Sequence, residues 1–431
     1  MGISRRGFLA GAAAGVAALS LPAAKWLNAA REDKLRIAVV GTANQAAWNI
    51  EQIRGEQIAA ICDVDAHYLE ACGKQFPDAK RFRDFREMLT ASLDLDAVLV
   101  AAPDHIHAPA AALGLRQGLH VYCEKPLAHT VEESRTLARL AIERQRVTQM
   151  GTQIHAGANY RRVVELIRSG AIGAVREVHV WCGKTWSNGK YAAPSPAPAH
   201  LDWNLWQGPA PEHEFSADIH PMNWRRFWAY GTGTLGDMAC HYLDLVHWAL
   251  DLRQPQTVEA TGPAVDAIGT PEWLIARFDH GARGAYGPVT VTWYDGGKRP
   301  ELLKTLKNKD GSALAWGDGH LFVGADGLVI SDYNKHLLLR GDTVADFKAP
   351  TPTIPDSIGH HAEWIRACKA GDRATTCNFG YSGALTETVL LGNVAYRVGK
   401  RLEWDPGKLK ATNAPEADQY LRAVYRSGWT L

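Results

Sequence analysis

The sequence has no excess of charge of either sign, and no basic block follows its first residues. Lys and Arg total 47, and Asp and Glu total 46. Proteins that bind nucleic acids or anionic membranes usually carry a stripe or patch of positive charge. The even balance therefore disfavours both kinds of partner.

Paired metal-ligand motifs and a clear disulfide framework are also missing. The chain contains neither a CxxC nor an HExxH motif, so no metal site is predicted. The seven cysteines are an odd number, and Cys62, Cys123 and Cys182 lie in strand-like apolar runs where small buried thiols are common. We expect no disulfide bond.

The first 30 residues read as a transport signal. The stretch Ser4–Leu9 contains an arginine pair and precedes an Ala- and Gly-rich apolar segment to Ala24, which resembles a twin-arginine export signal. An apolar run of about 18 residues is marginal for a membrane span, which needs roughly 20. We expect cleavage after Ala23, Ala24 or Ala30, a periplasmic or otherwise exported product, and no stable membrane association. An uncleaved anchor is the alternative.

Six short apolar runs predict a first domain at 34–152. Helix-like segments separate most of them, which is typical of a doubly wound parallel sheet in an α/β fold. With 431 residues and 46% hydrophobic content, the chain can also build a second core. The predicted strands are Leu35–Gly41, Gln57–Asp63, Lys80–Phe82, Ala97–Ala101, Gly118–Cys123 and Thr148–Gly151.

The turn after the first strand is a candidate cofactor loop. Asp63 ends the second strand, 22 positions after Gly41, close to the spacing at which a dinucleotide fold places a carboxylate on the ribose hydroxyls. Such an acid favours NAD over NADP. Alanine replaces the second and third glycines of the usual G-x-G-x-x-G pattern, and at the second position it limits how closely the backbone approaches a pyrophosphate. The loop reads Gly41, Thr42, Ala43, Asn44, Gln45 and Ala46.

Polar residues also follow two later strands of this sheet. The turn from Pro103 to His107 follows one of them, and Glu124 and Lys125 follow another. Open parallel sheets bind ligands outside the carboxyl ends of their strands, so these residues should face a crevice. A surface ion pair is the alternative for Glu124 and Lys125.

A second domain is predicted at 153–405, with residues 406–431 as a tail. Several of its apolar runs follow one another without helices, which predicts a largely antiparallel open sheet in an α+β arrangement. Trp186–Trp228 is a long loop-rich insertion, and a helix at Gly383–Val398 should return to the first domain. The predicted strands are Gly173–Cys182, Val258–Gly262, Trp273–Phe278, Gly284–Trp293, Gly319–Val323 and Gly327–Ile330.

A predicted helix at Gly236–Leu250 carries Asp237 and His241 four positions apart, and therefore on one face. Histidine titrates near neutrality, so it can take a hydroxyl proton while the carboxylate orients it. A lysine nearby would stabilise the developing alkoxide, or serve as the base itself. The alternatives are a helix-capping Asp237, a core histidine, or a metal site with Asp244.

Three further residues are predicted to reach a substrate. Arg225 lies in the tryptophan-rich insertion, where indole rings can stack on sugars and polar groups can bind hydroxyls. His155 and Tyr160 follow the last strand of the first domain. Surface or core roles are the alternatives.

Taken together, these motifs resemble those of the Gfo/Idh/MocA family, the glucose-fructose oxidoreductase and inositol dehydrogenase group. The shared residues are Gly41, Asp63, Pro103–His107, Glu124-Lys125-Pro126 and the segment Gly231–His241. The resemblance implies an NAD-dependent enzyme in which Lys125 lies beside the nicotinamide and the substrate hydroxyl. It also implies that Asp237 and His241 bind the substrate and exchange its proton, and that the second sheet builds dimers or tetramers.

The export signal constrains the function that this resemblance implies. No pool of NAD is expected outside the cytoplasm, so a tightly bound cofactor would be recycled within the catalytic cycle on a sugar, polyol or glycoside. One alternative is an NAD-dependent glycosidase or lyase that uses transient oxidation. Another is a non-catalytic sugar-binding pseudoenzyme, for which Ala43 and Ala46 are the best support.

Overall fold

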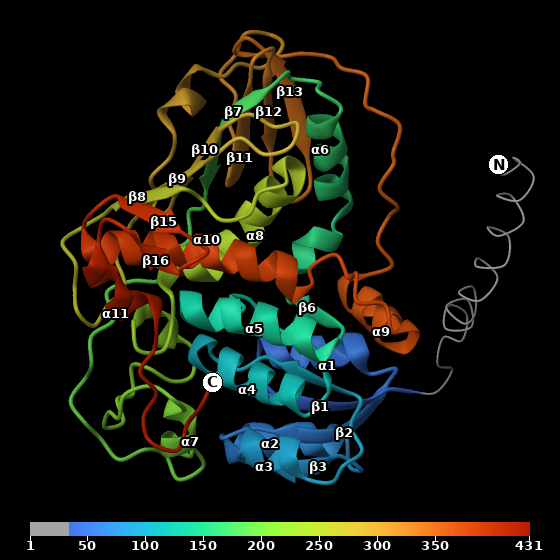
Figure 1. Ribbon diagram of the computed structural model, residues 1–431, viewed down its shortest axis with the longest axis vertical. Helices are drawn as coiled ribbons and strands as arrows, with labels where there is room; N and C mark the ends of the chain where they lie inside the picture. Colours follow the sequence, from blue (N-terminus) through green and yellow to red (C-terminus); the bar gives the residue numbers. More distant parts are fainter. Residues whose placement is uncertain (1–33) are drawn as a thin grey trace, which may run out of the picture.

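The computed structural model describes residues 34–431, and the predicted export signal at 1–30 lies outside them. Figure 1 shows an α/β part at the bottom and a large sheet at the top, with helices between them. Within the described residues, no helix combines the length and apolar character that a membrane crossing requires.

The lower part is built on a six-stranded sheet with the order β3-β2-β1-β4-β5-β6. All neighbouring strands are parallel. The central strands are buried along most of their length because helices cover both faces of a parallel sheet. The strands are β1 Arg36–Val40, β2 Gln57–Cys62, β3 Lys80–Phe82, β4 Ala97–Val100, β5 His120–Cys123 and β6 Thr148–Met150.

Helices connect these strands, and side-chain caps fix several of their starts. Asp65 and Asp84 each accept a hydrogen bond from a backbone amide in the first turn of the following helix. Thr130 and Glu133 form a capping box at the start of α5. The helices are α1 Gln45–Ile53, α2 Ala66–Gln75, α3 Phe85–Thr90, α4 Asp104–Arg116 and α5 Val131–Arg144.

The upper part is a ten-stranded sheet with the order β14-β13-β12-β11-β7-β10-β9-β8-β15-β16. Only β7 and β10 are parallel neighbours; the other pairs are antiparallel. The prediction of a largely antiparallel second sheet is therefore confirmed. The strands are β7 Val175–Trp181, β8 Thr257–Thr261, β9 Ile275–His280, β10 Val289–Tyr294, β11 Gly319–Gly324, β12 Leu328–Ser331, β13 His336–Arg340, β14 Thr343–Val344, β15 Leu402–Asp405 and β16 Lys410–Ala411.

Two strand predictions in this sheet need correction. β10 begins at Val289 rather than Gly284, because the backbones of Arg283 and Tyr286 bond to each other and close a turn. Strands β13 to β16 were not predicted from the sequence. Two of these four strands have two residues and the longest has five, too short for a clear alternation of apolar and polar residues.

Helices pack one face of the large sheet and join it to the lower part (Figure 1). Helix α10 lies against both α5 and α8, and the Arg135–Glu387 ion pair, at 2.7 Å, links α5 to α10. The remaining α-helices are α6 Ala158–Arg168, α7 Trp203–Gln207, α8 Gly233–Leu250, α9 His360–Ala370, α10 Phe379–Val398 and α11 Asp418–Leu421. Short 3-10 helices lie at η2 Gln153–Ala156, η3 Asn223–Arg226, η4 Glu301–Thr305 and η5 Pro415–Ala417.

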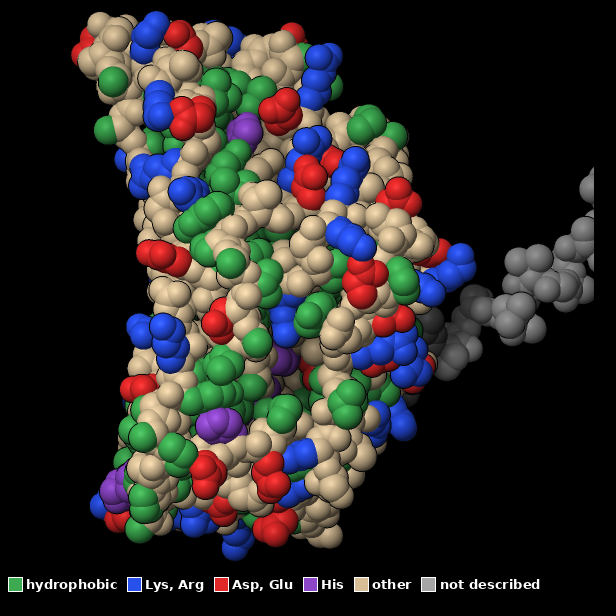
Figure 2. Space-filling model, turned by 90° about the vertical axis from the view of Figure 1, so that its left-hand side faces the viewer, with side chains coloured by type: hydrophobic (Ala, Val, Ile, Leu, Met, Phe, Trp, Pro, Cys, Tyr) green, Lys and Arg blue, Asp and Glu red, His purple; other side chains and the backbone are tan. Residues whose placement is uncertain are grey.

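The insertion and the end of the predicted tail both pack onto the lower part, whereas the start of the tail adds β16 to the large sheet. The insertion has its own aromatic core, which includes Trp206, Phe215 and Phe227. In the tail, the ring of Trp429 lies beneath Arg86, whose guanidinium carbon is 4.0 Å from the centre of the indole ring. On the face drawn in Figure 2, acidic and basic side chains are interspersed.

Candidate active site

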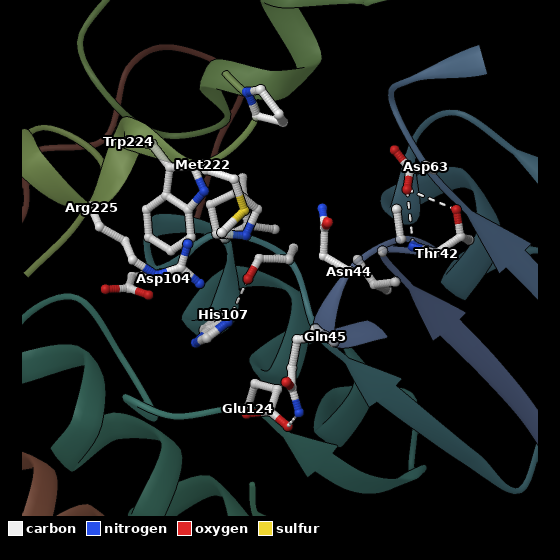
Figure 3. A pocket seen from close by; sticks show the side chains of 18 of the residues that line it. Thr42, Asn44, Gln45, Asp63, Asp104, His107, Glu124, Met222, Trp224 and Arg225 are labelled. Atoms are coloured by element: carbon white, nitrogen blue, oxygen red, sulfur yellow. Dashed lines mark hydrogen bonds between the residues drawn. The ribbon is translucent and has the colours of Figure 1, made fainter. Parts of the chain in front are cut away.

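A cavity of about 500 Å³ opens between the carboxyl ends of the first sheet and the second part of the molecule. Figure 3 shows Asp63 and Thr42 at one end, Trp224 and Arg225 at the other, and Asn44 between them. Residues from the β1–α1 loop, from the turns after β2, β4 and β5, and from α8 line it. Both parts of the chain therefore build one site.

The β1–α1 loop is shaped to receive an anion. Gly41 has a φ of 88°, and a Cβ at this position would lie 2.5 Å from the carbonyl oxygen of Ala101, so only glycine fits. Among the described residues, no acceptor is bonded to the backbone amides of Ala43, Asn44 and Gln45. Free amides at a helix start are suited to a pyrophosphate. Ala43, which occupies the position of the second glycine in the G-x-G-x-x-G pattern, lines the cavity.

Asp63 lies at the opposite edge of this loop. Its Oδ2 accepts hydrogen bonds from the backbone amide and the hydroxyl of Thr42, at 2.9 and 2.8 Å. Its Oδ1 accepts from the backbone amide of Asp65 at 2.9 Å. Oδ1 can accept a further bond, whereas Oδ2 already accepts two. The loop amides and this fixed acid therefore fit the pyrophosphate and ribose of NAD.

Glu124 is buried in the cavity wall, where its carboxyl group binds neighbouring side chains. Its Oε1 accepts hydrogen bonds from the side-chain amides of Gln153 at 2.7 Å, Asn49 at 2.9 Å and Gln45 at 3.3 Å. A Cβ at Gly151 would lie 2.6 Å from the Glu124 carboxyl group, so this glycine makes room for it. The predicted cofactor residue Glu124 thus holds Gln45 and Gln153 in place.

Pro103 and His107 border the same cavity at the start of α4. Both ring nitrogens of His107 lie 2.7 Å from carbonyl oxygens, one of Pro126 and one of Ala102. Burial lowers the pKa of the His107 imidazole to about 4, so the ring is neutral. Its single N–H donates to one of these two carbonyl oxygens, and both ring nitrogens are covered by the turns after β4 and β5, so His107 offers no free nitrogen to a ligand.

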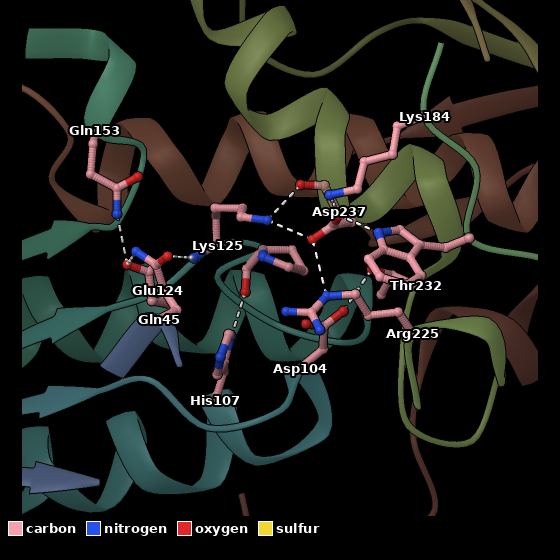
Figure 4. A network of polar contacts seen from close by, with 12 residues as sticks. Gln45, Asp104, His107, Glu124, Lys125, Gln153, Lys184, Arg225, Thr232 and Asp237 are labelled. Atoms are coloured by element: carbon pink, nitrogen blue, oxygen red, sulfur yellow. Dashed lines mark hydrogen bonds and ion pairs between the residues drawn. The ribbon is translucent and has the colours of Figure 1, made fainter. Parts of the chain in front are cut away.

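Lys125 crosses the cavity to the start of α8. Its Nζ donates to the carboxylate Oδ1 of Asp237 at 2.6 Å and to the carbonyl oxygen of the same residue at 2.7 Å (Figure 4). Burial disfavours the ammonium, but Asp237 outweighs burial and raises the Lys125 pKa above its usual value. Lys125 is therefore a protonated ammonium at neutral pH.

Asp237 is ionised despite its burial. Burial favours the neutral acid, but the charges of Lys125, Arg225 and Lys184 together bring the Asp237 pKa well below its usual range. The second carboxylate oxygen also accepts a hydrogen bond from the indole of Trp186 at 2.6 Å. The carboxylate is thus fixed on several sides.

His241 lines the cavity one helical turn after Asp237. Burial, aided by the charge of Lys125, lowers the pKa of its imidazole to about 3. The expectation that Asp237 orients this imidazole is wrong, because cations and Trp186 occupy the carboxylate and no hydrogen bond joins the two side chains within the described residues. His241 is nevertheless neutral and has a lone pair that can accept a proton, but the expectation that it titrates near neutrality is wrong, and its low pKa makes it a weaker base than a free imidazole.

These charges predict how the alkaline side of the pH profile depends on Asp237. In Asp237→Asn, burial and the charge of Arg225 would act on Lys125 unopposed by the carboxylate and would lower its pKa. We expect kcat/KM of the wild type to hold up to about pH 10, and that of the variant to fall at distinctly lower pH.

Asp342→Asn serves as the control, since it removes the carboxylate of an exposed 2.8 Å ion pair with Lys307 outside the cavity. Its profile should match the wild type. An alkaline limb at the same pH in Asp237→Asn and in the wild type would show that Lys125 does not control this side of the profile.

Two predicted substrate residues lie outside the cavity lining. His155 is buried, and its Nδ1 lies 2.9 Å from both carboxylate oxygens of Asp244 while its ring stacks on Trp248. Tyr160 is fully buried, and its hydroxyl donates to the carbonyl oxygen of His241 at 3.0 Å. The substrate predictions for both are wrong, because η2 and α6 turn these side chains into the core.

Several residues of the site were not anticipated. Lys184 and Trp186 come directly after β7, so the predicted end of that strand was an available signal. Asp104 lies inside a motif that the sequence analysis recognised, and its carboxylate accepts a hydrogen bond from the Thr232 hydroxyl at 2.8 Å. No sequence signal pointed to Trp429 as part of the cavity wall.

Comparison with known proteins places this geometry in a family. The model of the NAD-binding Rossmann fold of the Gfo/Idh/MocA oxidoreductases matches residues 35–152, and the model of their C-terminal alpha/beta domain matches residues 157–431. A solved NAD-binding protein from Listeria innocua shares the fold, with a TM-score of 0.61 at 14% identity over 86% of this chain and 97% of the other.

Two curated relatives have named activities. Inositol 2-dehydrogenase of Pseudarthrobacter chlorophenolicus is 30% identical over 153 residues, which are 34% of this chain and 45% of that protein. Levoglucosan dehydrogenase of Pseudarthrobacter phenanthrenivorans is 29% identical over 249 residues, 54% of this chain and 52% of that protein. The chain spans about half the length of these relatives. On the evidence of both family models, it belongs to the Gfo/Idh/MocA family of oxidoreductases and has an NAD-binding Rossmann domain.

Proposed function

We propose that the protein is an NAD-dependent oxidoreductase that acts on a hydroxyl group of a sugar or polyol. The observation that carries this proposal is the position of Lys125. Its ammonium is held by Asp237 and shares with His241 a cavity whose other end carries Asp63 and the free amides of the β1–α1 loop. A cofactor site and an acid/base site therefore form one continuous space.

The charge states assign a role to each residue. When bound, NAD supplies the hydride acceptor. The Lys125 ammonium stabilises negative charge that develops on the substrate oxygen as its proton leaves. Neutral His241 accepts that proton, and Asp237 fixes the lysine and contributes an acceptor for a substrate hydroxyl.

The same proposal includes export and a retained cofactor. The arginine pair at Arg5 and Arg6, followed by an apolar run, supports twin-arginine transport of a folded protein. An exported enzyme without access to free NAD would recycle its cofactor, either between two sugars or within a redox-neutral cleavage or epimerisation. The glycosidase or lyase alternative uses the same residues and differs in whether NADH accumulates.

A dimer or tetramer built on the outer face of the large sheet completes the proposal. On this face Asp279 accepts hydrogen bonds from the hydroxyls of Thr257 and Thr290, at 2.9 and 2.8 Å, and pairs with Arg277 at 3.1 Å. Such an ordered polar surface is suited to contact with a second copy. Light scattering of the purified protein gives the assembly size.

The decisive experiment is the cofactor content. We expect the purified mature protein to release NAD or NADH on denaturation, because both parts of the chain line the cavity and Asp63 fits the ribose hydroxyls. Enzymatic cycling assays of the supernatant distinguish NAD(H) from NADP(H). Release of NADPH, or an empty protein that fails to bind added NADH, would contradict the proposal.

A further inference from the structure

The substrate end of the cavity has more positive than negative charge. Three cations surround the single carboxylate of Asp237: Lys125 at 2.6 Å, Lys184 at 3.3 Å and Arg225 at 3.3 Å. Figure 4 shows that these three side chains reach it from different segments of the chain. One carboxylate balances only one of the three charges.

The other acids of the cavity lining do not balance this excess. Asp63 and Asp84 lie at the cofactor end, and the Glu124 carboxyl faces the amides of Gln45, Asn49 and Gln153. Asp104 is buried beneath Arg225, and burial raises its pKa to about 6. With Asp104 ionised, two carboxylates face the three cations, and Glu124, the remaining acid near Lys125, is already bonded to three side-chain amides.

Asp237 does not require all of these cations. Lys125 donates to its Oδ1, and the Trp186 indole donates to its Oδ2, so both oxygens already have partners. Additional cations in a partly buried site repel one another, and Arg225 works against the protonation of Lys125. Such an arrangement is favourable when a further anion enters the cavity.

The two additional cations are also available to a ligand. Among the described residues, the terminal guanidinium nitrogens of Arg225 donate to no acceptor, and only its Nε bonds to Asp237. The guanidinium lies 4.1 Å from the ring centre of Trp224, which limits its motion. The Lys184 side chain is 46% exposed and lies over the Trp186 ring.

We propose that the substrate is a sugar or polyol carrying an acidic group, a carboxylate or a phosphate, which Lys184 and Arg225 bind beside the reacting hydroxyl. This inference rests on the proposed function and names its substrate class. A planar guanidinium with free terminal nitrogens can make paired hydrogen bonds to either group, and the lysine adds a second charge.

Binding to the NADH-loaded protein tests the proposal without requiring turnover. Quenching of tryptophan fluorescence is followed for D-glucose, D-glucuronate, D-gluconate and glucose 6-phosphate, since Trp186 and Trp224 line the site. We expect at least one acidic compound to bind roughly tenfold or more tightly than glucose, and added salt to weaken it. Comparing the two carboxylates, D-glucuronate and D-gluconate, with glucose 6-phosphate shows which acidic group the site binds.

Two variants locate the effect. Lys184→Met and Arg225→Met should each weaken binding of the acidic compound roughly tenfold or more, and by a clearly larger factor than they weaken binding of glucose, with NADH binding retained. Lys307→Met, which removes an exposed cation outside the cavity, is the matched control. Thermal melting confirms that each variant is folded.

Equal affinity for neutral and acidic compounds, no measurable binding of any acidic compound, or unchanged binding in both variants would overturn the inference. The proposed function fails separately, through absence of NADH binding or of any hydride transfer.

Discussion

The protein should unfold as the pH falls from 7 to about 5, because at this pH many of its histidines would be protonated in the unfolded chain but stay neutral in the folded state. Burial lowers the pKa of eight imidazoles to values of about 3 or 4. In the unfolded chain the same groups titrate near pH 6.5. Between these values the unfolded state binds protons that the folded state does not, so acid favours unfolding.

Two buried carboxyl groups act in the opposite direction. Burial raises the pKa of Asp104 to about 6 and that of Asp295 to about 7. These groups hold a proton in the fold and lose it on unfolding, which stabilises the folded state between about pH 7 and pH 4. Five more histidines and four more carboxyl groups are shifted in the same two directions, so they too act in opposite senses.

The balance gives the size of the effect. Eight histidines that take up a proton on unfolding and two carboxyl groups that lose one leave a net uptake of about six protons. The free energy of unfolding should therefore fall by up to about 8 kcal/mol for each pH unit. The free energy of unfolding of a domain is usually only about 5–15 kcal/mol. Lowering the pH by one to two units below about 6.5 should therefore be enough to unfold the protein. Urea unfolding followed by circular dichroism at several pH values measures the slope.

Single substitutions test this account. His320 is fully buried and contacts the carbonyl oxygens of Tyr242 and Ser331, so His320→Gln should reduce the proton uptake by about one. A urea midpoint that is the same at pH 7 and pH 5 would show that these imidazoles are not neutral in the folded state.

Lys125→Met should lower turnover by roughly 10²- to 10³-fold, because it removes the charge that stabilises the developing alkoxide. The folded structure should persist, since Asp237 keeps Lys184, Arg225 and Trp186 as partners. The measurement is NADH formation with the best substrate found in the binding panel, together with the NAD content of the variant.

Lys125→Arg is the matched control for charge, and Lys307→Met is the control for loss of a lysine elsewhere. We expect partial activity in the first and full activity in the second. Near-normal turnover in Lys125→Met would place this residue outside the reaction. Loss of bound NAD from the variant would instead indicate a role in holding the cofactor.

The sequence alone determined the first sheet, its cofactor loop and the residues at its strand ends. This was possible because a parallel strand buried on both faces is a continuous apolar run, and Gly41 and Asp63 lie at the ends of two such runs. The helical spacing of Asp237 and His241 likewise placed both in the cavity. Each of these features depends on residues close together along the chain.

The tertiary structure alone decided what these side chains contact. Asp237 bonds to Lys125 and Trp186 rather than to His241, and Lys125 and Trp186 reach it from segments remote in the sequence. His155 and Tyr160 point into the core because the packing of α8 against η2 and α6 encloses them. Periodicity shows which face of an element is apolar, but it does not show which distant element covers that face. The pairing of charges and the burial of histidines depend on that second choice, and so do the pKa values that set the chemistry of the site.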